Sequence, residues 1–406
     1  MLFPLHSLPR ILYLGDVPVE ASHHGSALLF RLFEGFPPDR LRIIECDYCP
    51  SQEERRLPGI DYVSLPTGRQ RLLNSRFHGL YSGWLSWTAP ARAARARTLL
   101  SGFDPQAIVS VAHGFGWLTA ASLARALGVP FHLIVHDDWP RLSGIVSSLK
   151  DWLDRQFAAS YHQACTRLCV SPSMAEAYES RYGVSGSVLY PSRSSSCPVF
   201  EESAPRLGQE HPEFVVGYGG NSNPEVILCL QDLGKSLPSA RIQFSVFGPF
   251  DEQRQRELGM PSGSVTFHGL IPFQNMIHEL REAADLLFMP MPFDKDSREN
   301  MIVSFPSKLA DYTAIGLPIL IYGPPYCSAV RWAREHTGVA EIVDRQNSGD
   351  LAAAVARLQN EPALRIELAR RALEVGRLCF SHETVQEIFL KALRSELPSG
   401  ARVVTL

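Results

Sequence analysis

The stretch FPSKLADYTAIGLPIL, residues 305–320, carries the signals of a helix that runs directly into a buried strand. Pro306 favours a first helical turn, because its missing N–H would be unpaired there in any case. Gly316 and Pro318 end the helix, and PILIY follows as an apolar strand of the kind found in parallel sheets. We expect a helix of about ten residues whose N-terminus lies at the ligand-binding edge of the sheet.

Two charged residues interrupt this apolar stretch. Lys308 lies in the first helical turn, and Asp311 follows three residues later on the same face. A helix N-terminus carries free N–H groups and a partial positive charge of about half a unit, so it attracts anions. A lysine there opposes the helix dipole, and a bound phosphate would resolve that conflict. The alternative is a surface Lys–Asp pair that contributes only about a few tenths of a kcal/mol.

The composition bounds the class of protein. The 406 residues are 45% hydrophobic and 20% charged, with a formal net charge of -3. A chain of this length predicts two domains, and its charge provides no basic field for a nucleic-acid partner. The N-terminus has no basic leader followed by a long apolar core, and no window approaches about 18 uncharged apolar residues. We therefore expect a cytoplasmic protein.

The metal-binding residue types are scattered along the chain. Cys46 and Cys49 form a pair, but no second pair of ligands stands at the spacing of a zinc site. Asp294 and Asp296 form an Asp-x-Asp sequence, which we interpret as loop acids. The sequence predicts free thiols and no bound metal.

Apolar strands alternate with helical patterns in both halves of the chain, which predicts parallel sheets covered on both faces. A stretch rich in serine, proline and charge, residues 190–211, separates the halves as a linker. We expect an α/β protein with two parallel-sheet domains, 1–200 and 201–380, followed by a C-terminal helical segment, 381–406. The expected strands are 10–16, 41–48, 107–113, 131–136, one from 167, 214–220, 241–248, 264–269, 285–292 and 318–323.

Three further segments lie at predicted strand ends. His136 ends the strand FHLIVH, where a neutral imidazole could bond a substrate hydroxyl; a bond to local backbone is the alternative. Gly25 and Ser26 open the helix after the first strand. Gly220 and Asn221 follow the first strand of the second half, and glycine there permits close approach of a ligand. A plain strand-to-helix turn explains the glycines equally well.

Residues 68–97 combine arginines with Phe77, Tyr81, Trp84 and Trp87. This mixture suits an acceptor groove or a peripheral contact with a membrane surface. The alternative is a solvated helix whose aromatic side chains turn inward.

Five segments in a fixed order carry a family resemblance. SHHGS, VHDDWP, CVSPSMAEAYESRYG, TFHGLIP and PSKLADYTAIGLPIL together resemble the GT-B glycosyltransferases, specifically the group 1 or family 4-like members. The resemblance covers nearly the whole chain and is strongest from 214 to 345. It implies two Rossmann-like domains facing a cleft, with the C-terminal segment, 381–406, packing back on the first domain. It also implies an acceptor bound mainly by the N-terminal domain and a nucleotide-sugar donor bound mainly by the C-terminal domain without a metal or other cofactor.

The resemblance also assigns roles to residues of this sequence. Asp311 matches the second glutamate of the family's E-x7-E pattern and would contact the ribose, whereas Val303 replaces the first glutamate. Backbone amides from Asn300 to Ser304 would then hold the hexose. The family's Arg–Lys pair after the glycine turn is missing near Gly220, so Lys308, with the amides around Ser307, would bind the diphosphate. His136 matches the histidine near the transferred sugar, and the base edge would be read at Gly269, Leu270 and Ile271.

The resulting expectation is a retaining, metal-independent glycosyltransferase of polysaccharide biosynthesis. Its acceptor would be a glycan, a lipid-linked sugar or a small molecule. His136 and Lys308 are the expected catalytic residues, and Lys308 would stabilise charge on the leaving diphosphate. A nucleotide-sugar epimerase and a non-catalytic nucleotide-sugar-binding protein remain alternatives, because the same fold can serve all three.

Overall fold

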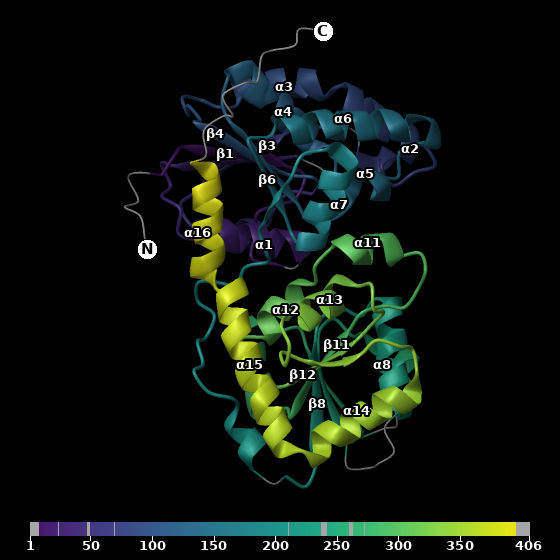
Figure 1. Cartoon of the computed structure of the whole chain (residues 1–406). Coiled ribbons are helices and arrows are strands. Elements are labelled where there is room, and N and C mark those ends of the chain that lie inside the picture. Colours follow the sequence, from purple (N-terminus) through teal and green to yellow (C-terminus); the bar gives the residue numbers. More distant parts are fainter. Residues whose placement is uncertain are drawn as a thin grey trace. The chain divides into compact units, whose positions relative to one another are not determined.

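A computed structural model describes residues 8–22, 24–46, 49–68, 70–209, 211–236, 242–259, 263–271 and 273–394 (Figure 1). The chain forms two compact units. The N-terminal unit contains residues 1–192 together with 385–406, and the C-terminal unit contains residues 193–384. The division falls inside the stretch expected to be a linker, and the end of the chain belongs to the first unit.

The N-terminal unit is built on one parallel sheet. Within the described residues its seven strands lie in the order β3-β2-β1-β4-β5-β6-β7. The central strand β1 pairs Tyr13 with Ile43 on one side and with Val109 on the other. The strands are β1 (Ile11–Gly15), β2 (Leu41–Cys46), β3 (Asp61–Leu65), β4 (Ala107–Val111), β5 (Phe131–Val135), β6 (Thr166–Cys169) and β7 (Ser187–Val188).

Helices cover both faces of this sheet. They are α1 (His24–Phe33), α2 (His78–Trp87), α3 (Ala89–Thr98), α4 (Gly116–Leu127), α5 (Trp139–Leu142), α6 (Lys150–Gln163), α7 (Pro172–Tyr182) and α16 (His382–Leu393), with short 3-10 turns η2 (Glu53–Arg55), η3 (Gln70–Leu72) and η4 (Ser147–Leu149). The last helix, α16, completes the hydrophobic core. Its Phe389 is fully buried and meets Phe33 edge to face, with ring centroids 5.7 Å apart.

The C-terminal unit repeats the same design. Its six described strands lie in the order β10-β9-β8-β11-β12-β13, and all of the pairings are parallel. Counted from the first strand of each unit, both sheets contain the order 3-2-1-4-5-6 of a Rossmann fold, and the N-terminal sheet adds β7 as a seventh strand. The strands are β8 (Phe214–Gly219), β9 (Ile242–Phe247), β10 (Val265–Gly269), β11 (Leu286–Pro290), β12 (Ile319–Tyr322) and β13 (Glu341–Val343).

The helices of the C-terminal unit include two long ones at its end, α14 and α15. The set is α8 (Pro224–Ser236), α9 (Glu252–Leu258), α10 (Phe273–Ala283), α11 (Arg298–Val303), α12 (Ser307–Tyr312), α13 (Ser328–Glu335), α14 (Ser348–Asn360) and α15 (Pro362–Phe380), with the 3-10 turn η5 (Pro205–Gly208). The strand order reverses between β8 and β11 here, and between β1 and β4 in the N-terminal unit. Ligands of such sheets bind at the carboxyl ends of the strands beside that reversal.

The prediction of two Rossmann-like parallel sheets is confirmed. Three strands were missed, namely β3, β7 and β13. β3 and β7 are the two edges of the N-terminal sheet, and β13 is one edge of the C-terminal sheet. β7 has only two residues and β13 only three. Edge strands bury little, so β3 reads as DYVSL without a continuous apolar run.

We expect Phe389→Ala to lower the free energy of unfolding of the N-terminal unit by about 3–5 kcal/mol, since it opens a cavity among Phe33, Phe36 and the sheet. Lys391→Ala, at an exposed position of the same helix, is the matched control and should change little. Urea denaturation followed by circular dichroism measures both. Equal stability of the two variants would mean that α16 is not part of this core.

Candidate functional site

Lys308 is held at the carboxyl end of β8 by a tyrosine. Its Nζ donates a hydrogen bond to Tyr218 Oη over 2.6 Å and lies 4.5 Å from the centre of that ring. Tyr218 Oη in turn donates to the Asn221 carbonyl over 2.7 Å. A Cβ on Gly220 would lie 2.2 Å from Lys308 Nζ, so any side chain there would displace the ammonium group. The fold therefore brings Lys308, Gly220 and Asn221 together.

A second tyrosine fixes the turn that follows β8. Tyr312 is fully buried; its hydroxyl accepts a hydrogen bond from the Gly219 amide over 2.8 Å and donates to the Gly219 carbonyl over 3.2 Å. Tyr312 and Lys308 lie four residues apart in α12. One short helix therefore supplies both the cation and the anchor of the turn that the cation faces.

Among the described residues, the Lys308 ammonium contacts the hydroxyl group and the ring of Tyr218, and neither carries a charge. Burial lowers the pKa of this ammonium group from 10.5 to about 7. A hydroxyl and the face of an aromatic ring form a favourable position for a cation but supply no full negative charge. An anion bound beside Nζ would raise this pKa again, so the site is electrostatically suited to one.

The helix that carries Lys308 is shorter than the sequence indicated. α12 spans six residues, so the prediction of about ten was wrong. The Thr313 hydroxyl donates to the carbonyls of Leu309 and Ala310, and Gly316, with φ of 78°, turns the chain into β12. A helix of this length has a weak macrodipole. The charge of the site resides mainly in Lys308 itself.

Val303 and Ser304 occupy the end of α11. The Val303 side chain is buried, and the Ser304 amide donates to the Asn300 carbonyl over 2.7 Å. The Met301 amide likewise donates to the Ser297 carbonyl over 2.9 Å. Two of the amides expected to hold a hexose are therefore already hydrogen-bonded within the protein.

Ser307 begins α12, and Asp311 lies one turn further along it. Asp311 interacts electrostatically with the buried guanidinium of Arg193. Arg193 also donates to the Ala310 carbonyl and to the Thr313 hydroxyl, each over 3.0 Å. The carboxylate of Asp311 thus has a cation of the same unit near it.

Gly248 connects the Lys308 site to the end of β10. Its amide donates to the Gly269 carbonyl over 2.9 Å, and a Cβ on Gly248 would lie 1.9 Å from the Gly220 carbonyl oxygen. Gly269 has φ of 68°, and the next residue, Leu270, is 78% exposed while Ile271 is half-buried. The predicted base-reading turn after β10 and the predicted diphosphate turn after β8 therefore lie on either side of Gly248, which follows the intervening strand β9.

His136 follows β5 in the N-terminal unit. Burial lowers its pKa to about 4, and His113 acts in the same direction while Asp137 opposes it. The imidazole is therefore neutral at neutral pH. A Cβ on Gly25 would lie 3.8 Å from His136 Nδ1, so the expected residues Gly25 and His136 do lie together, with Ser26 next in α1.

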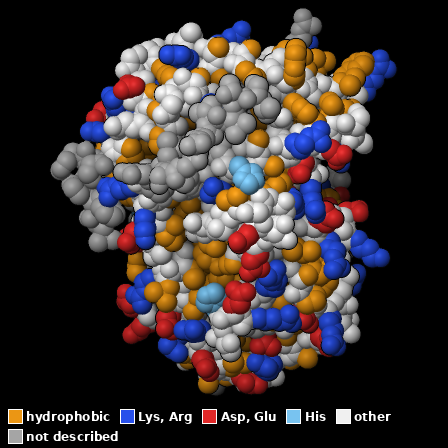
Figure 2. All heavy atoms as spheres, turned by 45° about the horizontal axis from the view of Figure 1, so that its top comes forward, with side chains coloured by type: hydrophobic (Ala, Val, Ile, Leu, Met, Phe, Trp, Pro, Cys, Tyr) orange, Lys and Arg blue, Asp and Glu red, His pale blue; other side chains and the backbone are white. Residues whose placement is uncertain are grey.

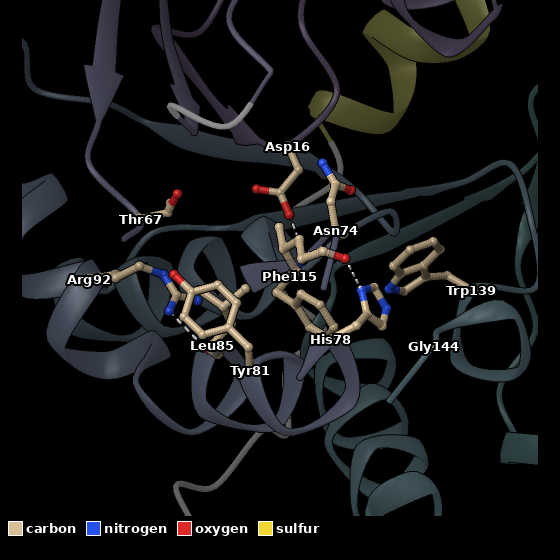
Figure 3. A pocket seen from close by; sticks show the side chains of 12 residues that line it. Asp16, Thr67, Asn74, His78, Tyr81, Leu85, Arg92, Phe115, Trp139 and Gly144 are labelled. Atoms are coloured by element: carbon tan, nitrogen blue, oxygen red, sulfur yellow. Dashed lines mark hydrogen bonds between the residues drawn. The ribbon is translucent and has the colours of Figure 1, made fainter. Parts of the chain in front are cut away.

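A cavity of about 240 Å³ in the N-terminal unit is lined in part by residues 68–97, the segment that suggested an acceptor groove, whereas its place in the sheet was not predicted from the sequence (Figure 3). It lies where the strand order reverses, because Asp16 follows β1 while Gly114 and Phe115 follow β4. The remaining lining residues come largely from α2 and its surroundings. They are Thr67, Leu73, Asn74, His78, Tyr81, Leu85, Arg92, Trp139 and Gly144.

Two buried charges define the chemistry of this cavity. The Asp16 carboxylate accepts hydrogen bonds from the amides of Phe115 and Gly116 at the start of α4. Arg92 is 7% exposed and donates to the Leu85 carbonyl over 2.7 Å and to the Thr119 hydroxyl over 3.2 Å. In Figure 3, Arg92 and Tyr81 lie toward one end, with His78 and Trp139 toward the other. The cavity can therefore accept a ligand that has both hydroxyl groups and an apolar part.

Sequence reasoning missed Asp16 and Tyr218, and it noted His78 and Arg92 only as members of the segment 68–97. The position of Asp16 directly after the first strand was a usable signal, although the prediction fell on Gly25 and Ser26 in the same segment. No pattern in the sequence marks Tyr218 as the partner of Lys308.

Membrane-spanning and metal-binding features are absent from the described part of the chain. None of its helices has the length and apolar character needed to cross a membrane. Nor do its His, Cys, Asp and Glu side chains form a group of three or more that could bind a metal ion. All eight cysteines are free thiols. Asp294 accepts a hydrogen bond from the Ser297 amide, in keeping with its interpretation as a loop acid.

Comparison with known proteins adds a family match and a fold. Residues 40–191 match the model of Glycosyltransferase Family 4. No curated protein sequence matches the chain. One similar solved structure is that of HepE from Anabaena in complex with UDP and glucose, with a TM-score of 0.65 and 14% identity over 96% of this chain and 100% of that chain. Sucrose-phosphate synthase from Thermosynechococcus elongatus has a TM-score of 0.66 and 15% identity over 95% of this chain and 98% of that chain. An alpha,alpha-trehalose-phosphate synthase (UDP-forming) from Burkholderia vietnamiensis has a TM-score of 0.65 and 14% identity over 98% of this chain and 99% of that chain.

These matches confirm the resemblance to GT-B glycosyltransferases of the group 1 or family 4-like type. The chain has the two-unit GT-B fold over almost its entire length. Its N-terminal unit also carries the family 4 match.

The depressed pKa of Lys308 has a consequence for stability. Between pH 7 and 10.5 the unfolded chain holds a proton that the folded protein has lost, so stability should rise with pH across this window. Lys308→Met removes the effect, and the free energy of unfolding of the native protein should therefore rise with pH relative to this variant. Urea denaturation at several pH values tests it, with Lys235→Met, at an exposed lysine, as control. Parallel pH profiles for all three proteins would contradict the assignment.

Proposed function

We propose that the protein is a retaining glycosyltransferase that moves a sugar from a nucleotide diphosphate sugar to an acceptor. The observation that carries this proposal is Lys308, whose ammonium contacts no carboxylate of the described residues and is held against a glycine turn at the reversal of the strand order. The family 4 match and the GT-B fold support the same conclusion. UDP and glucose are present in the similar HepE structure, so UDP is a rational first probe.

The diphosphate binds between Lys308 and the turn at Gly220 and Asn221. Glycine leaves the backbone open to the phosphate oxygens. When the bond between the sugar and the diphosphate breaks, negative charge grows on the departing phosphate oxygen, and the ammonium group stabilises that charge more than it stabilises the ground state. This role requires no metal ion.

The base, the ribose and the hexose of the donor also bind to the C-terminal unit. The base lies against the turn at Gly269, Leu270 and Ile271, and the ribose lies near Asp311. The hexose lies toward Val303, Ser304 and Ser307. Fewer backbone N–H groups are available to it there than expected, because the Ser304 amide already donates to the Asn300 carbonyl. A hydrophobic Val303 leaves hydroxyl recognition to other groups.

His136 acts as a neutral hydrogen-bonding group beside the reacting sugar. Its pKa of about 4 means that it carries no charge near pH 7. It therefore orients a hydroxyl without adding a positive charge. Gly25 and Ser26 form the backbone edge beside it. The acceptor occupies the cavity at Asp16 and Arg92 in the same unit.

One assay separates the functions that the fold permits. Release of the nucleotide diphosphate is measured for a panel of nucleotide sugars with and without candidate acceptors. Release that depends on an acceptor is the expected result. Release without an acceptor and with a changed sugar would instead identify an epimerase, and binding without release would identify a non-catalytic protein.

We expect Lys308→Met to reduce turnover at least tenfold, which corresponds to about 1.4 kcal/mol or more in the activation barrier. The loss follows from the missing charge at the leaving phosphate. Steady-state kinetics of the variant, with Lys235→Met as control, measure it. Native-like kinetics of Lys308→Met would remove the lysine from the diphosphate site.

His136→Ala should abolish most of the transfer while UDP affinity, measured by calorimetry, stays close to that of the native protein. The physical reason is that His136 belongs to the N-terminal unit, whereas the proposed UDP contacts belong to the other unit. A parallel fall in UDP affinity would reassign His136 to donor binding or to folding.

A further inference from the structure

Helix α2 packs with its smallest residues and exposes its largest ones. A Cβ on Gly79 would lie 2.7 Å from Val146 Cγ1, and one on Gly83 would lie 2.6 Å from Leu149 Cδ1. Ser82 and Ser86 are also buried on this side. Together with the buried Leu85, glycine and serine therefore form the inner face of the helix, which is more often formed by large apolar residues.

The opposite side of the helix and its N-cap carry large apolar side chains. Phe77 is 47% exposed, Leu80 62%, Trp84 46% and Trp87 75%. Steps of three, four and three residues separate them, so they lie along one stripe, which we call the α2 apolar face. Folding of the unit does not explain this face, because its side chains lie largely outside the core. The alternative interpretation, in which these aromatic residues turn inward, is wrong for Phe77, Trp84 and Trp87.

The α2 apolar face lies within a strongly basic segment. From residue 62 to residue 103 the sequence contains six arginines and no aspartate or glutamate, in a chain whose net charge is -3. Arg71, Arg76, Arg95 and Arg97 are exposed, and among the described residues none of these four forms an ion pair. In Figure 2, hydrophobic and basic side chains lie together at the upper right edge, the side on which Figure 1 places α2.

We propose that the α2 apolar face and its arginines dock the protein on an anionic lipid surface. Tryptophan and phenylalanine side chains insert at the level of the lipid head groups, while exposed arginines attract anionic lipids with about 1 kcal/mol each. This function goes beyond sugar transfer and requires no change in the donor site.

Charge complementarity selects the lipid over a second copy of the chain. A symmetric dimer through this face would bring the arginines of one copy against those of the other, and like charges in contact oppose association. An anionic membrane supplies the opposite charge over a wide surface, together with an apolar layer for the exposed rings.

The docking surface and the cavity share a helix. Tyr81 lines the cavity, and its ring stacks on Trp84 of the α2 apolar face, with centroids 5.3 Å apart and an interplanar angle of 15°. His78 and Leu85 of α2 also line the cavity. A lipid surface that receives Trp84 would therefore lie close to the cavity wall.

Sedimentation with vesicles tests the proposal on the full chain. We expect binding to phosphatidylglycerol vesicles, much weaker binding to phosphatidylcholine vesicles, and loss of binding as salt is added. Each of Arg76→Gln, Arg95→Gln and Arg97→Gln should lower the partition coefficient about fivefold. Arg256→Gln, an exposed arginine of α9, is the control.

The apolar half of the surface is tested with the double variant Trp84→Ser/Trp87→Ser. It should lose vesicle binding but keep its far-ultraviolet circular dichroism and its UDP affinity, whereas Leu228→Ser, at a leucine that is 57% exposed in α8, should bind like the native protein. Native-like vesicle binding by the double variant would overturn the proposal. Failure of the native protein to bind phosphatidylglycerol vesicles would overturn it as well. In that case, a native dimer seen by light scattering that the double variant dissociates would show that the face binds a second copy of the chain instead. Intact UDP binding in either case keeps the proposed function separate from this result.

Discussion

The ammonium group of Lys308 constrains the turn that follows β8 in the C-terminal unit. It is held against the Tyr218 hydroxyl and ring, and Gly220 must lack a side chain for it to reach that position. Tyr312, from the same short helix, holds the Gly219 backbone in place. Because desolvation of an ammonium group without a bound anion is unfavourable, an anionic ligand beside Lys308 would stabilise its charged form.

The two units share one sheet topology but carry different polar groups at the place where the strand order reverses. Each sheet reverses its strand order beside its first strand, and each reversal carries polar groups at the carboxyl ends of the strands. In the C-terminal unit that place holds a cation and a glycine turn. In the N-terminal unit it holds Asp16 and Gly114, whose close approach leaves no room for a side chain at position 114. The negatively charged donor and the hydroxyl-bearing acceptor of the proposed reaction would suit these two environments.

The sequence predicted the parts of this structure that depend on local signals. The stretch around Lys308 combines a proline, a glycine and a continuous apolar run, so its helix and strand could be predicted, although the helix already ends at Tyr312. The edge strands β3, β7 and β13 bury too little to show a clear pattern. The place of the cavity in the sheet was missed because Asp16 and Arg92 are distant in sequence, and Tyr218 because its partner is ninety residues away. The aromatic residues of α2 were noticed, but only the structure could show which side of the helix they occupy.

The return of α16 to the first sheet has a consequence for synthesis of the chain. Phe389 completes a core whose other members, such as Phe33 and Phe36, leave the ribosome far earlier. At about 5–20 residues per second, the intervening C-terminal unit takes roughly ten to forty seconds to translate. During that interval the nascent N-terminal unit has an incomplete apolar surface that a chaperone could cover, while the C-terminal unit can close its own core first.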